Sequence, residues 1–214
     1  MFGKNFLRRF IMMGWWVLVQ ALPMAGWADS PVKVLFLGDS ITAGFGVEPD
    51  QAWPALVEKM AKDRGLNHVI FMNGSISGST SASALSRLKW HQRTAPHILF
   101  LALGANDGLR GLSTIKMKEN LAKAIAFASG AGMDVLLAGM VVPPNYGPEY
   151  AAEFKQVFPE LAKTHDLTLI PFLLKDVGGH PQMNQADGIH PNPQGHQVIA
   201  KTVFPYIFEK IQKK

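Results

Sequence analysis

The 214-residue chain contains no cysteine. Disulfide bonds, thiolate metal sites, iron–sulfur clusters, cysteine nucleophiles and lipid attachment through an N-terminal cysteine are therefore excluded. Charged residues are also few, at 17%, whereas 48% of the residues are hydrophobic. This balance excludes a disordered chain, and the length is sufficient for one domain with a substantial buried core.

Several well-known functional motifs are missing as well. The sequence has no Gly-x-Ser-x-Gly, which carries the nucleophile of α/β-hydrolases, and no P-loop or Gly-x-Gly-x-x-Gly after a predicted strand. Its seven histidines form no His-Glu-x-x-His motif and no helical i,i+4 pair. We therefore expect neither a catalytic metal nor a bound cofactor.

The N-terminal segment has the pattern of a signal peptide. Three basic residues within the first ten precede the apolar run 11–19, and small residues occupy the −3 and −1 positions of a cleavage site after Ala28. A membrane-spanning helix needs about 20 apolar residues, roughly twice the length of this run. We predict that residues 1–28 are removed and that the domain 29–214 is periplasmic or secreted, with no remaining membrane anchor.

Most of the net positive charge of the sequence lies in this N-terminal segment. The formal charge of the whole chain is +5, from 21 basic and 16 acidic residues. Removal of residues 1–28 takes away three basic residues and no acidic one, so that a charge of +2 remains. So small a charge does not favour a nucleic-acid partner. We expect a monomer whose partner is a small-molecule substrate.

Short apolar runs rich in β-forming residues alternate with longer amphipathic segments, without repeats or linkers. The predicted strands are 32–37, 68–72, 97–103, 135–140 and 167–170, and the predicted helices are 52–64, 81–92, 113–129, 150–165 and 193–210. This alternation predicts an α/β fold, a three-layer α/β/α sandwich around a flavodoxin-like, five-stranded parallel sheet. In such sheets the functional site lies beyond the carboxyl ends of the strands.

Polar residues and glycines gather at these strand ends. Ser40 follows the first strand; it is either a helix N-cap or a nucleophile exposed at a strand–helix corner. Gly78, after the second strand, offers an unobstructed backbone N–H, and Asn106, after the third, offers a side-chain amide to an oxyanion. The alternative for Asn106 is ordinary turn chemistry.

A second group lies near the C-terminus. Asp187 precedes His190 by three residues, so that its carboxylate can accept a hydrogen bond from Nδ1–H and leave Nε2 as a base. An exposed turn is the alternative explanation of this pattern. His196 is the competing candidate for the base.

Four ordered segments together resemble the conserved blocks of the SGNH hydrolases, also called the GDSL esterase/lipase family. They are Gly38-Asp39-Ser40, the segment around Gly78, Gly104-x-Asn106-Asp107 and Asp187-x-x-His190. Further stretches, including 75–78 and 106–111, are similar to the periplasmic branch described as arylesterase, acyl-CoA thioesterase and lysophospholipase. The resemblance extends from about Val34 to the C-terminal helix.

This resemblance implies a fold and a set of roles. Ser40 matches the nucleophile, His190 the general base and acid, and Asp187 the group that orients the imidazole. The backbone N–H groups of Ser40 and Gly78 and the side-chain amide of Asn106 match the oxyanion donors. Ser79 stands where many relatives have an acidic residue, which leaves open how the Gly78 loop is anchored.

The expected function is hydrolysis of carboxylic esters and thioesters with medium to long acyl chains, through an acyl-enzyme on Ser40. Segment 108–111 has glycines at both ends, as in a mobile lid, and Arg110 is either a contact for a phosphate or coenzyme A, or a solvated charge. Two alternatives are an O-acetyl esterase acting on polysaccharide or peptidoglycan and a non-catalytic flavodoxin-like binding module. The candidate substrate-binding residues are Ile76, Leu109, Arg110, Pro144 and Tyr146, with Leu112, Val142, Pro143 and Met183 as further candidates for an apolar groove.

Overall fold

The computed structural model describes residues 31–214, so the predicted signal peptide, residues 1–28, lies outside the described residues. Five strands form one parallel sheet in the order β2-β1-β3-β4-β5, which is the flavodoxin-like order. The predicted α/β fold is thereby confirmed. The strands are β1 (Val32–Gly38), β2 (Val69–Asn73), β3 (Ile98–Ala102), β4 (Asp134–Ala138) and β5 (Thr168–Ile170).

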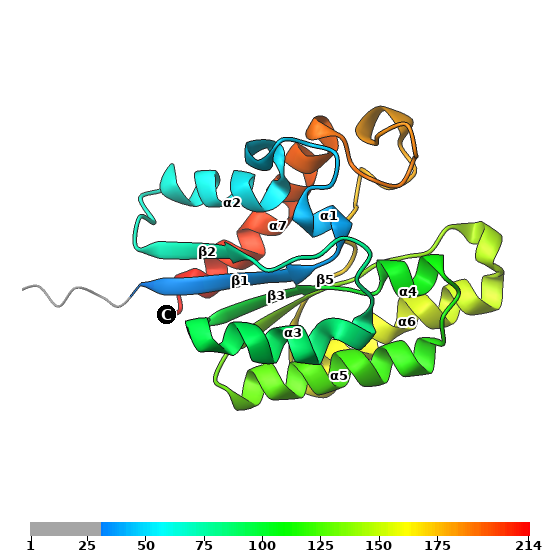
Figure 1. Cartoon of the computed structure of the whole chain (residues 1–214), viewed down its shortest axis with the longest axis horizontal. Helices are drawn as coiled ribbons and strands as arrows, with labels where there is room; N and C mark the ends of the chain where they lie inside the picture. Colours follow the sequence, from blue (N-terminus) through cyan, green and yellow to red (C-terminus); the bar gives the residue numbers. More distant parts are fainter. Residues whose placement is uncertain (1–30) are drawn as a thin grey trace, which may run out of the picture.

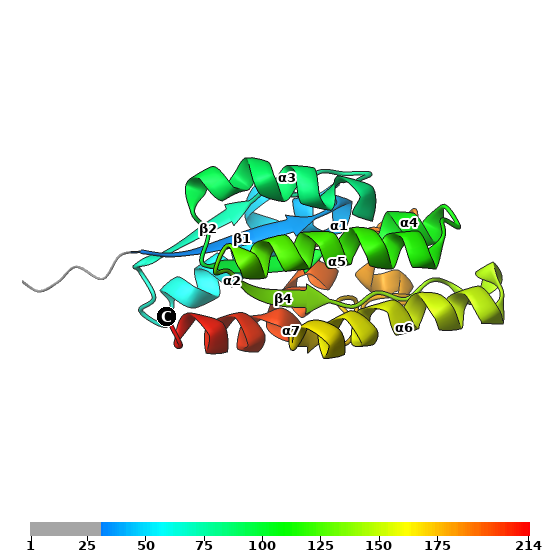
Figure 2. The same ribbon diagram turned by 90° about the horizontal axis from the view of Figure 1, so that it is seen from below.

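Helices cover both faces of the sheet. Helices α2 and α7 pack together on one face, and α3, α5 and α6 lie side by side on the other (Figures 1 and 2). No helix of the segment 31–214 has the length and apolar character needed to cross a membrane. The helices are α1 (Ser40–Ala43), α2 (Trp53–Lys62), α3 (Ala84–His91), α4 (Ala105–Leu109), α5 (Thr114–Gly130), α6 (Pro148–His165) and α7 (Pro193–Ile211), with 3-10 turns η1 (Pro49–Gln51), η2 (Ser81–Ser83), η3 (Gln92–Thr94), η4 (Pro144–Tyr146) and η5 (Pro181–Met183).

Local sequence explains where these elements lie. Every residue of β3 is buried, as expected of a central strand covered by helices on both faces. Helix α7 begins with Pro193, and the side chain of Asn192 caps it by accepting from the N–H groups of Gln194 and Gly195, both at 3.0 Å. Because all five strands are parallel, their carboxyl ends meet at one edge, and α1 and α4 begin there (Figure 1).

Helix α4 is the main departure from the predicted elements. Ordinary turn chemistry was the alternative for Asn-Asp-Gly and no helix was predicted there, but residues 105–109 form a helix. Gly108 packs so closely that an added Cβ would lie 2.4 Å from Val142 and 2.7 Å from Phe154. The lack of a side chain at Gly108 therefore allows this close packing.

Candidate active site

Ser40 is held at the first residue of α1 by a sharp turn out of β1. A Cβ at Gly38 would lie 2.3 Å from the hydroxyl oxygen of Thr42, so only glycine allows the strand to turn directly into the helix. Asp39 is the N-cap, and its Oδ1 accepts from the Ile41 N–H at 3.1 Å. The cap role that the sequence left open for Ser40 thus belongs to Asp39, and the Ser40 hydroxyl is free to interact elsewhere.

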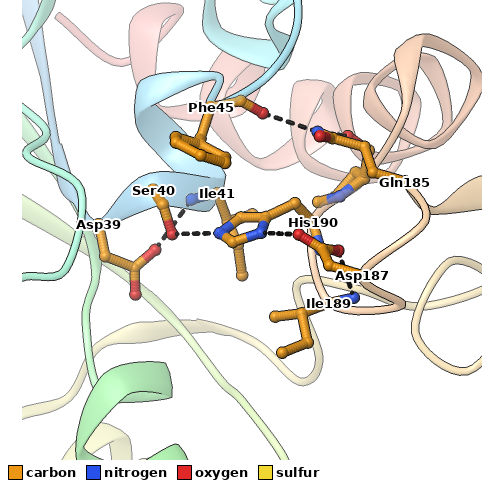
Figure 3. Close-up of polar contacts among 9 residues, drawn as sticks. Asp39, Ser40, Ile41, Phe45, Gln185, Asp187, Ile189 and His190 are labelled. Atoms are coloured by element: carbon orange, nitrogen blue, oxygen red, sulfur yellow. Dashed lines mark hydrogen bonds and ion pairs between the residues drawn. The ribbon is translucent and has the colours of Figure 1, made fainter.

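His190 is carried by a short hairpin that we call the histidine hairpin, residues 184–192. Asn184 and Pro191 pair in antiparallel fashion, and the Gln185 N–H donates to the His190 carbonyl at 2.8 Å. The turn between them places Gly188 in the left-handed region, at φ 70°. This geometry aims the imidazole toward the start of α1 (Figure 3).

Three predicted side chains from two distant parts of the sequence meet at this point. His190 Nε2 lies 2.9 Å from Ser40 Oγ, and His190 Nδ1 lies 2.6 Å from Asp187 Oδ2. Figure 3 shows the serine, the imidazole and the carboxylate in a continuous line. A hydroxyl, an imidazole and a carboxylate in this order form the arrangement of a serine-hydrolase triad.

The Asp187 carboxylate is set up to remain ionised. Its pKa is lowered to about 2 by hydrogen bonds from the His190 backbone N–H, from the His190 side chain and from the Ile189 N–H. A carboxylate accepting from Nδ1–H holds the imidazole in the tautomer whose Nε2 is a proton acceptor. The Phe45 ring packs against the imidazole with a centroid separation of 4.7 Å, which further restricts its orientation.

The oxyanion donors expected from the family resemblance lie on segments that the Asn106 side chain connects. Within residues 31–214, neither the Ser40 N–H nor the Gly78 N–H has a hydrogen-bond acceptor, so both are free for a ligand. The Asn106 amide donates to the Ser79 carbonyl at 3.1 Å and lies 3.4 Å from Asp39 Oδ2. Asn106 is therefore placed between the Gly78 loop and the start of α1.

The side chain of Asp107 anchors the Gly78 loop. Its buried carboxylate accepts from the Ser81 N–H at 2.8 Å and from the Ser81 hydroxyl at 2.6 Å. Arg110 adds a bond from its guanidinium to the Gly78 carbonyl at 3.0 Å. In the sequence Asp107 is recognisable only as part of the Gly104-x-Asn106-Asp107 motif, and its position next to Asn106 was the available signal for this role.

Two further charged groups next to the nucleophile were not singled out from the sequence. Asp39 is buried, and this burial raises its pKa to about 6 despite the hydrogen bond from Ile41. Arg87, on α3, donates to the carbonyls of Gly38 at 3.0 Å and Gly74 at 2.5 Å, and thereby joins the ends of β1 and β2. Burial lowers the pKa of this guanidinium.

A largely apolar cavity of about 350 Å³ lies next to the triad. Its volume is within the range of roughly 300–1,000 Å³ that is usual for small-molecule sites. Its wall includes the neighbours of Ser40, Asn106 and His190 in the sequence. The lining residues are Ile41, Ala105, Leu109, Met140, Val141, Val142, Pro143, Phe172, Leu174, Gly178, Gly179, Asn184, Gly188 and Ile189.

The expected substrate-binding residues are distributed unevenly around this cavity. Leu109 lines it, as do Val142 and Pro143, but Ile76, Arg110, Tyr146, Leu112 and Met183 do not. The Tyr146 hydroxyl donates to the Leu109 carbonyl at 2.7 Å, and Arg110 binds the Gly78 carbonyl. These two side chains support the loops around the cavity and do not form its wall, while Pro144 begins η4 next to the cavity residue Pro143.

His196 is excluded as the base by its surroundings. It is fully buried on α7, and its Nδ1 accepts from the Trp53 N–H at 3.2 Å. Burial, together with the nearby His190, lowers its pKa to about 4. In residues 31–214 no three His, Asp or Glu side chains are placed to hold a metal ion.

Comparison with known proteins decides the family. The profile of the GDSL-like Lipase/Acylhydrolase family matches residues 36–198. The chain belongs to this family. As a GDSL family member it is an esterase, and the predicted family resemblance is confirmed.

The GDSL family relatives include well-covered curated proteins. "Esterase TesA" of Pseudomonas aeruginosa is 40% identical over 173 residues, which cover 80% of this chain and 86% of the relative. "Thioesterase 1/protease 1/lysophospholipase L1" of Escherichia coli K12 is 38% identical, over 78% of this chain and 79% of the relative. A crystal structure of TesA has a TM-score of 0.80 and 39% identity, over 83% of this chain and 99% of that one.

Proposed function

We propose that the protein hydrolyses carboxylic esters and thioesters of medium to long acyl chains, with Ser40 as nucleophile. The observation that carries this proposal is the hydrogen-bonded sequence of Ser40, His190 and Asp187, with contacts of 2.9 Å and 2.6 Å. Both distances lie within the reach that proton transfer requires, about 2.6–3.2 Å.

The reaction begins when Ser40 Oγ attacks the acyl carbonyl carbon and its proton passes to His190 Nε2. The carbonyl oxygen becomes an oxyanion, which accepts hydrogen bonds from the N–H groups of Ser40 and Gly78 and from the Asn106 amide. Asp187 stabilises the imidazolium that forms. His190 then returns the proton to the departing alkoxide or thiolate, which leaves Ser40 acylated.

Water completes the cycle by attacking the acyl-enzyme. His190 takes one proton from this water as its oxygen bonds to the acyl carbon, and then donates the proton to Ser40 Oγ as that ester bond breaks. The products are a carboxylic acid and an alcohol or thiol, and the enzyme regains its starting protonation state.

The cavity supports an acyl-chain substrate. Ile41 and Ile189, which flank the triad residues in the sequence, contribute to its wall, so an apolar chain bound there begins next to the reacting carbonyl. Val141 is exposed on the same wall and would be covered by such a chain. The name of the Escherichia coli relative, a thioesterase and lysophospholipase, supports thioesters and lysophospholipids as substrate classes.

The place of action is part of the proposal. The signal-peptide pattern of residues 1–28 supports export, and we propose a monomeric periplasmic or secreted enzyme. Cell fractionation and N-terminal sequencing of the mature protein test this statement. A mature chain that begins at Asp29 in the periplasmic fraction is expected, and a cytoplasmic chain with an intact N-terminus would contradict it.

The central experiment compares substrates on the purified enzyme, with Ser40→Ala as the matched control. The panel comprises aryl esters from acetate to palmitate, an acyl-CoA, a lysophospholipid and an acetylated sugar. We expect activity on the longer esters and on the thioester, and a loss of at least roughly 10⁴-fold in Ser40→Ala. Substantial activity in a folded Ser40→Ala variant would refute the nucleophile, and a strict preference for acetyl groups would refute the substrate class.

A further inference from the structure

We infer that Gln185 is a positioning residue whose side-chain amide clamps the histidine hairpin to the loop that follows the nucleophile. The inference rests on the proposed roles of Ser40 and His190. It concerns how their separation is maintained, because Gln185 itself does not contact the reacting atoms.

The amide of Gln185 bridges two distant segments of the chain. Its Nε2 donates to the Phe45 carbonyl at 2.7 Å, across 140 positions of sequence (Figure 3). The same Nε2 donates to the Pro191 carbonyl at 2.9 Å. Both amide protons are used in these two bonds. The backbone N–H of the same residue donates to the His190 carbonyl, so Gln185 binds the carbonyl of the histidine and that of the residue after it.

The hairpin is otherwise anchored to a different part of the molecule. The buried side chain of Asn184 donates to the carbonyls of Val177 and His180, both at 2.8 Å. Asn192 caps α7 and donates to the Gln182 carbonyl at 2.9 Å. None of these bonds reaches the segment that carries Ser40, so they hold the hairpin without setting its distance from the nucleophile.

Few contacts join the hairpin to the nucleophile segment, residues 40–47. In the described chain, two hydrogen bonds connect them: Gln185 with the Phe45 carbonyl, and His190 with the Ser40 hydroxyl. The second is the bond that must be broken and remade during catalysis. Of these two hydrogen bonds, the Gln185 bond is therefore the one that persists while the serine is acylated.

The nucleophile segment is shaped to receive this amide. Gly46 has a φ of 76°, and a Cβ there would lie 2.2 Å from Gln185 Oε1, so the amide lies directly against the glycine backbone. Phe45 contributes twice, because its carbonyl accepts from Gln185 while its ring packs on the imidazole at 4.7 Å. Release of the clamp thus frees both the hairpin and the ring that restrains His190.

The expected consequence is kinetic. A displacement of about 1 Å in catalytic geometry costs up to about 10²-fold in rate. Gln185→Met keeps the length of the side chain and removes both donors. We expect kcat to fall by about 10- to 100-fold in this variant and KM to stay within about twofold, because the cavity wall does not include Gln185.

The matched control is Gln182→Met. Gln182 is an exposed glutamine three residues earlier, and its side chain makes no hydrogen bond within residues 31–214. The kcat of each protein is normalised to active sites titrated with a phosphonate ester, and thermal unfolding is recorded. We expect Gln182→Met to behave as the unmodified enzyme and Gln185→Met to lose kcat per titrated site with an unchanged melting temperature. Should Gln185→Met fail to fold, Gln185→Asn, which is too short to span both carbonyls, carries the same expectations.

A second measurement distinguishes an effect of Gln185 on the position of His190 from a general loss of activity that does not depend on His190. In a His190→Ala background the clamp has no imidazole to position, so adding Gln185→Met is expected to leave the residual rate unchanged. An equal loss in both backgrounds would overturn the inference. So would a normal kcat per titrated site, or a raised KM with normal kcat. Activity retained by Ser40→Ala would instead overturn the proposed function, so the two failures are distinguishable.

Discussion

Replacement of Asp39 by asparagine is expected to raise the stability of the protein at neutral pH and to lower its esterase activity. Asp39 is buried next to the nucleophile, and burial raises the pKa of its carboxyl from 3.8 to about 6. Asparagine has nearly the same shape and retains an oxygen that can cap Ile41. The substitution removes the buried charge and leaves Asn106 without a carboxylate facing its amide.

The sign and size of the stability effect follow from the pKa. A raised pKa means that the folded protein binds this proton more tightly than the unfolded chain. Between pH 3.8 and about 6 the free energy of unfolding therefore falls as pH rises. Above pH 6 the carboxyl is ionised in both states, and the loss of stability caused by its burial has reached its full size. At about 1.36 kcal/mol per pKa unit, a shift of this size means that ionisation of Asp39 destabilises the folded protein by about 3 kcal/mol at pH 7.5 and by about 1 kcal/mol at pH 4.5.

Urea unfolding of both proteins at these two pH values is the assay. The stability of Asp39→Asn relative to the unmodified protein should increase by about 2 kcal/mol from pH 4.5 to pH 7.5. The comparison cancels Asp187, whose lowered pKa has the opposite effect and is common to both proteins. Esterase activity should fall at the same time, because the charge facing Asn106 is lost. A stability difference that does not change with pH would refute the reasoning.

Two further predictions concern the oxyanion site and the cavity. Asn106→Ala should lower kcat by about 10²–10³-fold with little change in KM, since the amide acts on charge that develops in the transition state; a loss expressed only in KM would contradict its role. Val141→Trp should narrow the cavity and shift the aryl-ester preference toward short chains, whereas Ile115→Trp, at an exposed position outside the cavity wall, should not. Equal chain-length profiles for the two tryptophan variants would place the acyl chain elsewhere.

Much of the architecture was predictable because local physics determines it. Strands such as β3 are continuous apolar runs, and parallel strands joined by helices leave few topologies open. Asp187 and His190 are close enough in sequence to form their contact within one turn, so their pairing needs little tertiary information. Helix α4 was missed because its sequence favours a turn, and packing of Gly108 against Phe154 overrides that preference.

The supporting contacts were not predictable in the same way. Nothing in the local sequence distinguishes Gln185 from Gln182, yet one joins two loops and the other is exposed. Tyr146 was expected to face substrate, but its hydroxyl lies against the Leu109 carbonyl. Such roles depend on which loops the fold places side by side, and that is a property of the whole chain.

By itself, the order of residues determined the sheet, the family and the chemical groups at its carboxyl edge, since short-range periodicity and motif spacing carry that information. Tertiary structure alone decided that Gln185 reaches the Phe45 carbonyl, that Asp107 anchors the Gly78 loop and that His196 is buried against Trp53. The reason is physical: hydrogen bonding and burial depend on distances between segments separated by tens of residues, and only the packed chain sets those distances.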